Sequence, residues 1–489
     1  MTRFVTLKSG RALMAVALLA SASACTTVGP NYGGAPGVAE SAATRGQFLR
    51  GGAASTEAPV ARWWETLGDA ELTRLIDNAL ANSPNVAIAN AKIAQARAGL
   101  AANRTANVPT AGTSVTAPYI NIPGNLLNPQ ASNDRTDIQR YSLGFDASWE
   151  LDLFGGTKRK IESASAKAEA AEAGLADAQV SLSAEVARAY TGLRARQAAL
   201  GLLEQQRGLD TQLVSLAGQR LRQGTAPEQP LDQMRAQLAQ TEGQIASTRA
   251  EITVLIDQLA LLTGREPGAL DAALTPVRPI PTPPAEVRIG DPALLLRNRP
   301  DIRIAERQLA AANADVGATI AEKFPKVSFM GMLGMGGGSP VDMLNPSELI
   351  GLVLPRISWT LFDGGRTKAK IEASKGAYAE AEARYQASVL SALTDAENAL
   401  THFGSDRIEL GKALEAEAQA RRVVRLQDQR AKAGTTSRSD ALSAERQRLQ
   451  LAMAATNARA ELTSDYIAVQ KALGIGWTPS ADVAPAKAP

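Results

Sequence analysis

The sequence contains very little of what usually marks a redox, metal or nucleic-acid site. It has one Cys and one His in 489 residues, so an intrachain disulfide is impossible and a Cys/His metal site is disfavoured. Its 52 basic and 49 acidic residues nearly cancel, and no Lys or Arg run indicates a nucleic-acid surface. No stretch approaches the roughly 18 consecutive apolar residues that a transmembrane helix needs.

Bulky aromatic side chains are also scarce. They make up 4% of the chain, whereas all hydrophobic residues together reach 45%, and alanine fills much of the difference. Length alone would suggest three domains at about 150 residues each. Alanine is the strongest helix former and lets helices approach closely, so the composition favours long, closely packed helices over three ordinary cores.

The N-terminus has the order of an export signal. Basic residues precede an apolar run at 12–20, and small residues at 21–24 lead directly to Cys25. This order predicts a signal peptide over 1–24. It also resembles a bacterial lipoprotein box with Cys25 as the lipidated residue; a plain signal peptide with a chance Cys is the alternative. Thr26, where an Asp would favour inner-membrane retention, points to the outer membrane.

The rest of the chain repeats itself. The run W-E-L-D-L-F-G-G-T-K-R-K-I-E from Trp149 matches W-T-L-F-D-G-G-R-T-K-A-K-I-E from Trp359, 210 positions later. The predicted organisation is an extended N-terminal segment (25–62), a first repeat (63–266), a Pro-rich linker (267–292), a second repeat (293–476) and a tail (477–489). Each repeat is expected to run helix, strand, strand, long helix, helix.

The long helices are predicted at about 157–223 and 367–433. Each would be about 100 Å long, more than a globular domain requires. A sustained seven-residue apolar spacing indicates coiled-coil-like packing. One pair of rows is Val186, Leu193, Leu200, Arg207, Val214, Leu221 and Val389, Ala396, Phe403, Leu410, Glu417, Val424, Ala431. Arg207 and Glu417 interrupt these rows and are expected either to reach water or to pair.

Alternating apolar and polar residues predict strands at about 110–121, 138–153, 326–337 and 349–362. Their length suits a membrane β-barrel, although a soluble sheet on a helix bundle has the same pattern. The residues predicted on the barrel's outer face and rim are Tyr141, Phe145, Trp149, Phe154, Trp359 and Phe362. Those predicted toward the lumen are Asp146 and Arg356. Four strands cannot close a barrel, so three chains are expected to supply twelve strands and twelve helical columns.

Specific motifs resemble a known family. L-L-L-R-N-R-P-D-I-R-I-A-E-R-Q-L-A-A-A-N-A from Leu294, C-T-T-V-G-P-N-Y from Cys25 and W-W-E-T-L-G-D-A-E-L from Trp63 are similar to NodT-type outer-membrane efflux lipoproteins, which are TolC-like outer-membrane factors of RND tripartite systems. The resemblance implies a mainly α homotrimer, with a 12-stranded outer-membrane β-barrel continuing into a 12-helix periplasmic α-barrel. It also implies a periplasmic adaptor and an inner-membrane pump as partners.

The resemblance further implies that the Gly-Thr turns form the periplasmic tip, adaptor contact and gate. The residues concerned are Gly224, Thr225, Asp232, Arg430, Gly434, Thr435, Arg438, Asp440 and Ser443. Asp440 matches an acidic gate position, whereas Ser443 stands where a second acid is usual. Helix capping is the alternative role for Asp440.

No convergent acid, base or nucleophile indicates an enzyme, and the carboxylates are spread along helix faces. No cofactor is expected apart from the lipid on Cys25. The predicted function is a passive conduit for drugs or other small toxic compounds. A type I protein-secretion channel is the alternative, and a periplasmic coiled-coil scaffold is a weaker one. The sequence does not identify the cargo, because selectivity resides mostly in the pump.

Overall fold

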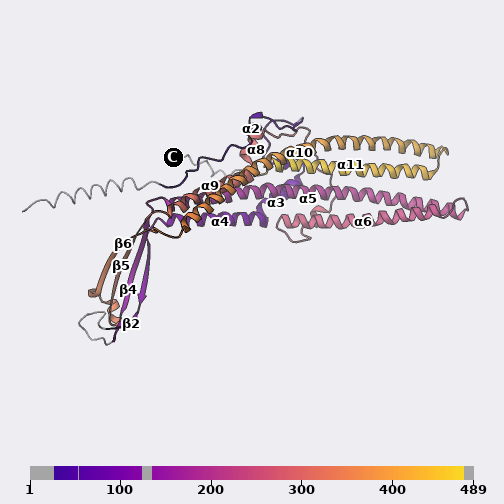
Figure 1. Cartoon of the computed structure of the whole chain (residues 1–489). Helices are drawn as coiled ribbons and strands as arrows, with labels where there is room; N and C mark the ends of the chain where they lie inside the picture. Colours follow the sequence, from indigo (N-terminus) through magenta and orange to yellow (C-terminus); the bar gives the residue numbers. More distant parts are fainter. Residues whose placement is uncertain (1–26, 53, 124–134, 478–489) are drawn as a thin grey trace, which may run out of the picture. The chain divides into compact units, whose positions relative to one another are not determined.

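The computed structural model describes residues 27–52, 54–123 and 135–477 (Figure 1). The predicted signal peptide at 1–24, the predicted lipidation site at Cys25 and the predicted tail beyond Trp477 lie outside these residues. Within the described ranges, no helix combines the length and the apolar character needed to cross a membrane.

The two halves of the chain share the predicted order of helix, strands, long helix and helix, and the first half adds the short strands β2 and β3. The first half contains α3 (Ala70–Asn82), α4 (Pro84–Thr105), β1 (Thr110–Thr116), β2 (Tyr119–Pro123), β3 (Arg135–Gln139), β4 (Tyr141–Leu151), α5 (Gly156–Arg222) and α6 (Gln229–Leu262). The second contains α8 (Pro292–Asn298), α9 (Pro300–Ala321), β5 (Lys326–Gly337), β6 (Leu349–Ser358), α10 (Arg366–Lys432) and α11 (Arg438–Ala472). Shorter pieces are α2 (Glu40–Arg45), η1 (Trp63–Leu67), α7 (Asp271–Leu274), η3 (Pro340–Leu344) and η4 (Pro346–Glu348).

The chain forms two compact units, and each unit draws on both halves. The strand unit comprises residues up to Ala35, Ala94–Ala170 and Glu306–Arg384; the helical unit comprises Pro36–Ile93, Ala171–Ala305 and residues from Tyr385 onward. The boundaries fall inside α4, α5, α9 and α10. The compact units therefore do not coincide with the sequence repeats.

Both long helices contain 67 residues and begin at matching joints. Gly155 and Gly365, just before them, have positive φ values of 76° and 91°. The Asp363 carboxylate accepts hydrogen bonds from the backbone N–H groups of Gly365 at 2.9 Å and Thr367 at 2.7 Å. Such caps satisfy N–H groups that a helix start leaves unpaired.

The core of the helical unit gathers aromatic and aliphatic side chains from many elements. Trp63 and Trp64 pack edge to face with ring centroids 5.7 Å apart, and Tyr466 of α11 lies 6.0 Å from Trp63. Leu72, Ile76, Leu182, Val186, Leu193, Leu259 and Ile467 belong to the same cluster. The few aromatic residues of the helical unit are thus concentrated where the helices converge.

Only part of each seven-residue row predicted in α5 and α10 is buried. Val186, Leu193, Val389, Ala396 and Phe403 are buried as predicted. Further along α5, the buried positions are instead Leu203, Gln206, Asp210 and Leu213. The reason is a polar contact with α6: Thr241 donates to Asp210 at 2.8 Å and accepts from Gln206 at 3.2 Å. The spacing of apolar residues in the sequence cannot predict a buried row that contains polar residues.

The two charges in those rows do not pair with each other. Arg207 is exposed, and Glu417 forms an ion pair of 2.6 Å with Arg421 on the same helix. Arg207 therefore takes the expected position in water.

The strand unit contains a four-stranded antiparallel sheet in the order β1-β4-β5-β6. Its central contact joins the halves of the chain, with β4 paired to β5 from Tyr141↔Gly337 to Leu151↔Val327. The strand predicted at 110–121 is broken, because Pro118 has no N–H for the ladder. Beyond it, β2 and β3 form a separate two-stranded sheet. The strand predicted at 138–153 is divided at Arg140 into β3 and β4. The loop predicted at 121–137 lies largely outside the described residues, and its described ends belong to β2 and β3.

Equivalent glycines end α6 and α11, where the repeats make matching close contacts. Gly264 and Gly474 both have a φ of 71°. A Cβ on Gly264 would lie 2.5 Å from the Asn82 carbonyl oxygen, and one on Gly474 would lie 2.8 Å from Cγ of Arg299. Each glycine thus allows a helix end to approach the segment that leads into α4 or α9.

We expect Gly474→Ala to lower stability by about 1–3 kcal/mol, because it adds both backbone strain and a clash. Loss of the helical circular-dichroism signal on heating the detergent-solubilised protein measures this. Gly243→Ala is the matched control, because Gly243 is an exposed residue of α6 with open space around its Cβ position. Gly243→Ala should keep or raise the melting temperature, because alanine is the better helix former. A melting temperature of Gly474→Ala at or above that of the wild type would contradict the packing argument.

Candidate channel site

Register places three of the six residues predicted for the outer face and rim, Tyr141, Phe145 and Trp149, on one face of the sheet. Side chains of directly paired residues lie on the same face, so Phe145 shares a face with Leu333, and Trp149 with Phe329. The same face carries Tyr141, Leu143, Ala147, Val327, Met335, Val353 and Ile357. It is therefore almost wholly apolar across both halves of the chain.

Aromatic residues are fixed at the ends of the strands. The Trp149 indole N–H donates to the Asn107 carbonyl at 2.9 Å, and that of Trp359 donates to the Lys323 carbonyl at 3.0 Å. The repeat thus preserves the hydrogen bond that holds each tryptophan. Phe154 stacks on Phe324 with ring centroids 4.6 Å apart, whereas the Phe362 side chain is 90% exposed.

The opposite face carries Asp146 and Arg356, the two residues predicted to face the lumen. Asp146 accepts a hydrogen bond of 2.6 Å from Ser114. Arg356 is paired across β6 and β5 with Ser328. This face is less polar than expected in the second half of the chain, because Met330, Met332, Leu352 and Leu354 also lie on it.

The two Gly-Thr turns, predicted to form the periplasmic tip, are built in the same way. Gly224 and Gly434 have φ values of 68° and 72°. The Thr225 N–H donates to the Arg220 carbonyl at 2.9 Å, and the Thr435 N–H donates to the Arg430 carbonyl at 2.9 Å. A left-handed glycine followed by this back-bond ends a helix and reverses the chain.

The turns differ in how the next helix begins. Asp440 completes a capping box with Ser437, whose hydroxyl donates to the carboxylate at 2.7 Å. The hydrogen bond from Ser437 and then that from Thr436 lower the pKa of Asp440. In the first half, α6 has no side-chain cap, and Asp232 pairs with Arg235 at 3.4 Å. The alternative reading of Asp440 as a capping residue is therefore correct locally, and its role as a gate stays a prediction.

Other charges surround the second turn. Arg438 and Lys432 both pair with Asp428, at 3.2 and 2.6 Å. The hydrogen bond from Lys432 lowers the pKa of Asp428. Arg430 is exposed, and Ser443 offers no second carboxylate. Sequence reasoning missed Asp428, because it lies on the helix before the turn and outside the recognised motif.

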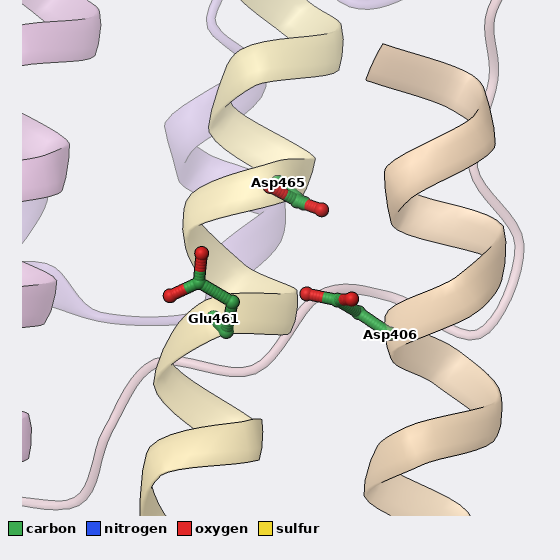
Figure 2. A group of neighbouring side chains, drawn as sticks. All are labelled: Asp406, Glu461 and Asp465. Carbon is green, nitrogen blue, oxygen red and sulfur yellow. The ribbon is translucent and has the colours of Figure 1, made fainter. Parts of the chain in front are cut away.

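An acidic cluster joins α10 and α11 in the helical unit. Figure 2 shows Asp406 on α10 reaching toward Asp465 and Glu461 on α11. One carboxylate oxygen from each residue lies within 4.8 Å of the others. In the described part of the chain, no other three His, Cys, Asp or Glu side chains gather closely enough to hold a metal ion. Burial, followed by the charges of Asp406 and Glu461, raises the pKa of Asp465 to about 6. The sequence did not reveal this cluster, because its members come from two helices.

Comparison with known proteins agrees with this architecture. A model of the family described as outer membrane efflux protein matches residues 75–265 and 292–475. The pyoverdine export outer membrane protein OpmQ of Pseudomonas aeruginosa is 30% identical, over 95% of this chain and 98% of that protein. Nodulation protein T of Rhizobium leguminosarum bv. trifolii is 27% identical, over 93% of this chain and 95% of that protein.

The solved structure of the outer-membrane channel OprN gives a TM-score of 0.81 at 32% identity, covering 92% of this chain and 99% of that channel. The fold is thus that of an outer-membrane channel, mainly helical with a strand region built from two tandem repeats. The chain belongs to the outer membrane efflux protein family.

The raised pKa of Asp465 predicts a pH-dependent stability. An acid whose pKa is higher in the folded than in the unfolded chain destabilises the fold as pH rises from about 4 to about 6, and the cost persists above that range. We expect Asp465→Asn to raise the melting temperature at about pH 8 and to change it little near pH 4. Glu242→Gln, an exposed position on α6, is the control. If Asp465→Asn raised the melting temperature by the same amount at both pH values, this explanation would be wrong.

Proposed function

We propose that this efflux channel is a passive conduit, which carries small toxic compounds from a periplasmic adaptor and an inner-membrane RND pump to the exterior. The observation that carries the proposal is the four-stranded sheet with one continuous apolar face and aromatic side chains at the strand ends. Such a face suits the hydrocarbon region of a membrane, and the aromatic side chains suit its boundary. Membership of the efflux family supports it.

The proposed assembly is a homotrimer. Within the described residues, β1 and β6 are the edges of the four-stranded sheet. Unpaired edges are not tolerated in lipid, so β6 of one copy pairs with β1 of the next. Three copies supply twelve strands and close the barrel around the face that carries Asp146 and Arg356.

The proposed docking site for the adaptor is the pair of tip turns at Gly224-Thr225 and Gly434-Thr435. Both turns are exposed, and both are fixed by the same backbone hydrogen bond. Charged residues of both signs flank them, among them Asp428, Arg438 and Asp440. This offers an adaptor a rigid contact with directional polar groups.

We also propose that Cys25 carries the lipid of an outer-membrane lipoprotein. Small residues precede it directly in the sequence. In addition, the backbone N–H of Val28 donates to the Phe154 carbonyl at 3.1 Å, at the joint between β4 and α5. The chain therefore emerges beside the proposed membrane-spanning strands, where a lipid anchor is useful.

Small-molecule efflux is favoured over type I protein secretion. The relatives carry names such as pyoverdine export protein, solvent efflux pump protein SrpC and toluene efflux pump protein TtgI of Pseudomonas species. These names describe the export of small molecules by those proteins. In this proposal the pump supplies the energy for transport, because a passive conduit needs no catalytic group of its own.

Deleting the gene should lower the inhibitory concentration of several small toxic compounds severalfold, and the wild-type gene should restore it. Gly336→Val should not restore it, because a Cβ there would lie 2.2 Å from the Tyr141 carbonyl oxygen and disrupt the β4–β5 pairing. Gly338→Val, with open space at its Cβ, is the matched control. If deletion left all tested compounds unaffected and instead stopped the secretion of a protein into the medium, type I secretion would be the function.

A second experiment separates the gate and capping roles of Asp440. Asp440→Asn removes the charge but keeps an oxygen that can accept from Ser437, whereas Asp440→Ala removes both. If three Asp440 carboxylates help to hold the entrance closed, both variants raise single-channel conductance in planar bilayers. Wild-type conductance in Asp440→Asn, with a change only in Asp440→Ala, would reduce the role of this residue to capping.

A further inference from the structure

Residues 27–32 are fastened to the strand unit by more contacts than an anchor tether requires. Thr27 lies against Gly155 and leaves no room for a side chain there: a Cβ on Gly155 would lie 2.6 Å from Cγ2 of Thr27. The φ of Gly155, 76°, also favours glycine. Asn313 of α9 donates to the Pro30 carbonyl at 3.1 Å, and the Tyr32 hydroxyl donates to Glu306 at 3.0 Å. The segment is therefore seated along the start of α5 and the face of α9.

Arg159 is the centre of this seat. Its residue exposure is 2%, although arginine seldom lies so deep without several partners. Its guanidinium donates to the carbonyls of Val28 and Gly29, each at 3.1 Å. It also donates to the Asn31 side chain at 2.7 Å and to Glu162 at 2.8 Å. One buried side chain thus binds three of the six residues.

The backbone is shaped to let Arg159 reach them. Gly29 has a φ of 87°, and a Cβ on it would lie 2.4 Å from Cα of Gly317 on α9. A Cβ on Gly317 would in turn lie 2.9 Å from Nε of Arg159. Two glycines therefore bring the segment, α9 and the guanidinium together, and no other residue type fits at either position without a shift.

We infer that Arg159 is the positioning residue for the lipid-bearing end of the chain, and that this clamp, and not the acyl chains, holds residues 27–32 in place. The inference rests on the lipoprotein part of the proposed function. Cys25 lies two positions before Thr27, and an extended chain spans at most about 7 Å over that distance. The clamp thereby confines the acyl chains to the neighbourhood of the Phe154–Phe324 pair, at the joint of strands and helices.

The competing explanation is that membrane insertion of the lipid holds the segment, with the contacts of Arg159 following passively. The two explanations differ in what survives when one component is removed. A clamp keeps residues 27–32 ordered without a lipid, whereas a lipid tether keeps them ordered without Arg159.

Hydrogen exchange of the Val28 amide, which donates to Phe154, tests the clamp. It is measured on four forms in detergent: wild type, Arg159→Ala, Lys158→Ala and a non-lipidated form. The last carries Cys25→Ser behind a signal peptide that is cleaved without lipid transfer. Lys158 is the matched control, because its side chain is exposed next to Arg159. We expect the Val28 amide to exchange at least about tenfold faster than in the wild type in Arg159→Ala only. This factor corresponds to the loss of charge-assisted hydrogen bonds.

Slow exchange in Arg159→Ala, or fast exchange in the Cys25→Ser form, would overturn the clamp. A heat-dissociable trimer band checks that each variant is folded. If Arg159→Ala gives no trimer, Asn31→Ala decides, because it removes a single acceptor at an exposed position and should still speed exchange. Wild-type exchange in Asn31→Ala would then count against the clamp.

The position of the lipid is tested in cells fed a photoreactive fatty acid. In the wild type and Lys158→Ala, crosslinks should fall near Phe154 and Phe324, and in Arg159→Ala they should spread to other sites or other molecules. Absence of the fatty acid from the wild-type protein would overturn the lipoprotein proposal itself. A labelled protein with the same crosslinks in Arg159→Ala would overturn only the positioning role.

Discussion

The open edges of the β1-β4-β5-β6 sheet impose the constraint on which the rest of this protein depends. Each unpaired backbone N–H or C=O in a bilayer costs several kcal/mol, and four strands cannot close on themselves. With the apolar face of the sheet in lipid, as proposed, the edges have to meet other copies of the chain. The proposed trimer follows from the need to pair these edges. A continuous sheet also requires the strands of both halves to keep one register, with Phe145 opposite Leu333 and Trp149 opposite Phe329.

Much of this architecture could be predicted from the sequence, because repetition and periodicity are local signals. The 210-residue shift between Trp149 and Trp359 gave the element order, and the two long helices begin and end within one residue of their predicted limits. The alternation in β4 correctly separated Phe145 and Trp149 from Asp146. Pro118 explains the break in the strand predicted at 110–121, whereas the division of the strand predicted at 138–153 into β3 and β4 left no such mark in the sequence.

What could not be predicted depends on contacts between distant segments. The buried row near Asp210 is polar because Thr241 on another helix pairs with it, and the Asp406–Glu461–Asp465 cluster exists only where α10 meets α11. Arg159 appears in the sequence as one basic residue among Lys158 and Lys160. Its burial under residues 27–32 becomes visible only in three dimensions. At the tip, the family motif identified Asp440 but not the capping box that holds it.

The pairing of β4 with β5 has a consequence for the time course of biogenesis. These strands lie on opposite sides of α5 and α6 in the sequence, so β4 is exported well before its partner. For that interval the first half presents an unpaired strand edge and an apolar face to the periplasm, both of which promote aggregation. Neither half can finish its own sheet. The tandem order therefore leaves an open strand edge and an apolar face on each chain until β5 and β6 have followed β1 and β4.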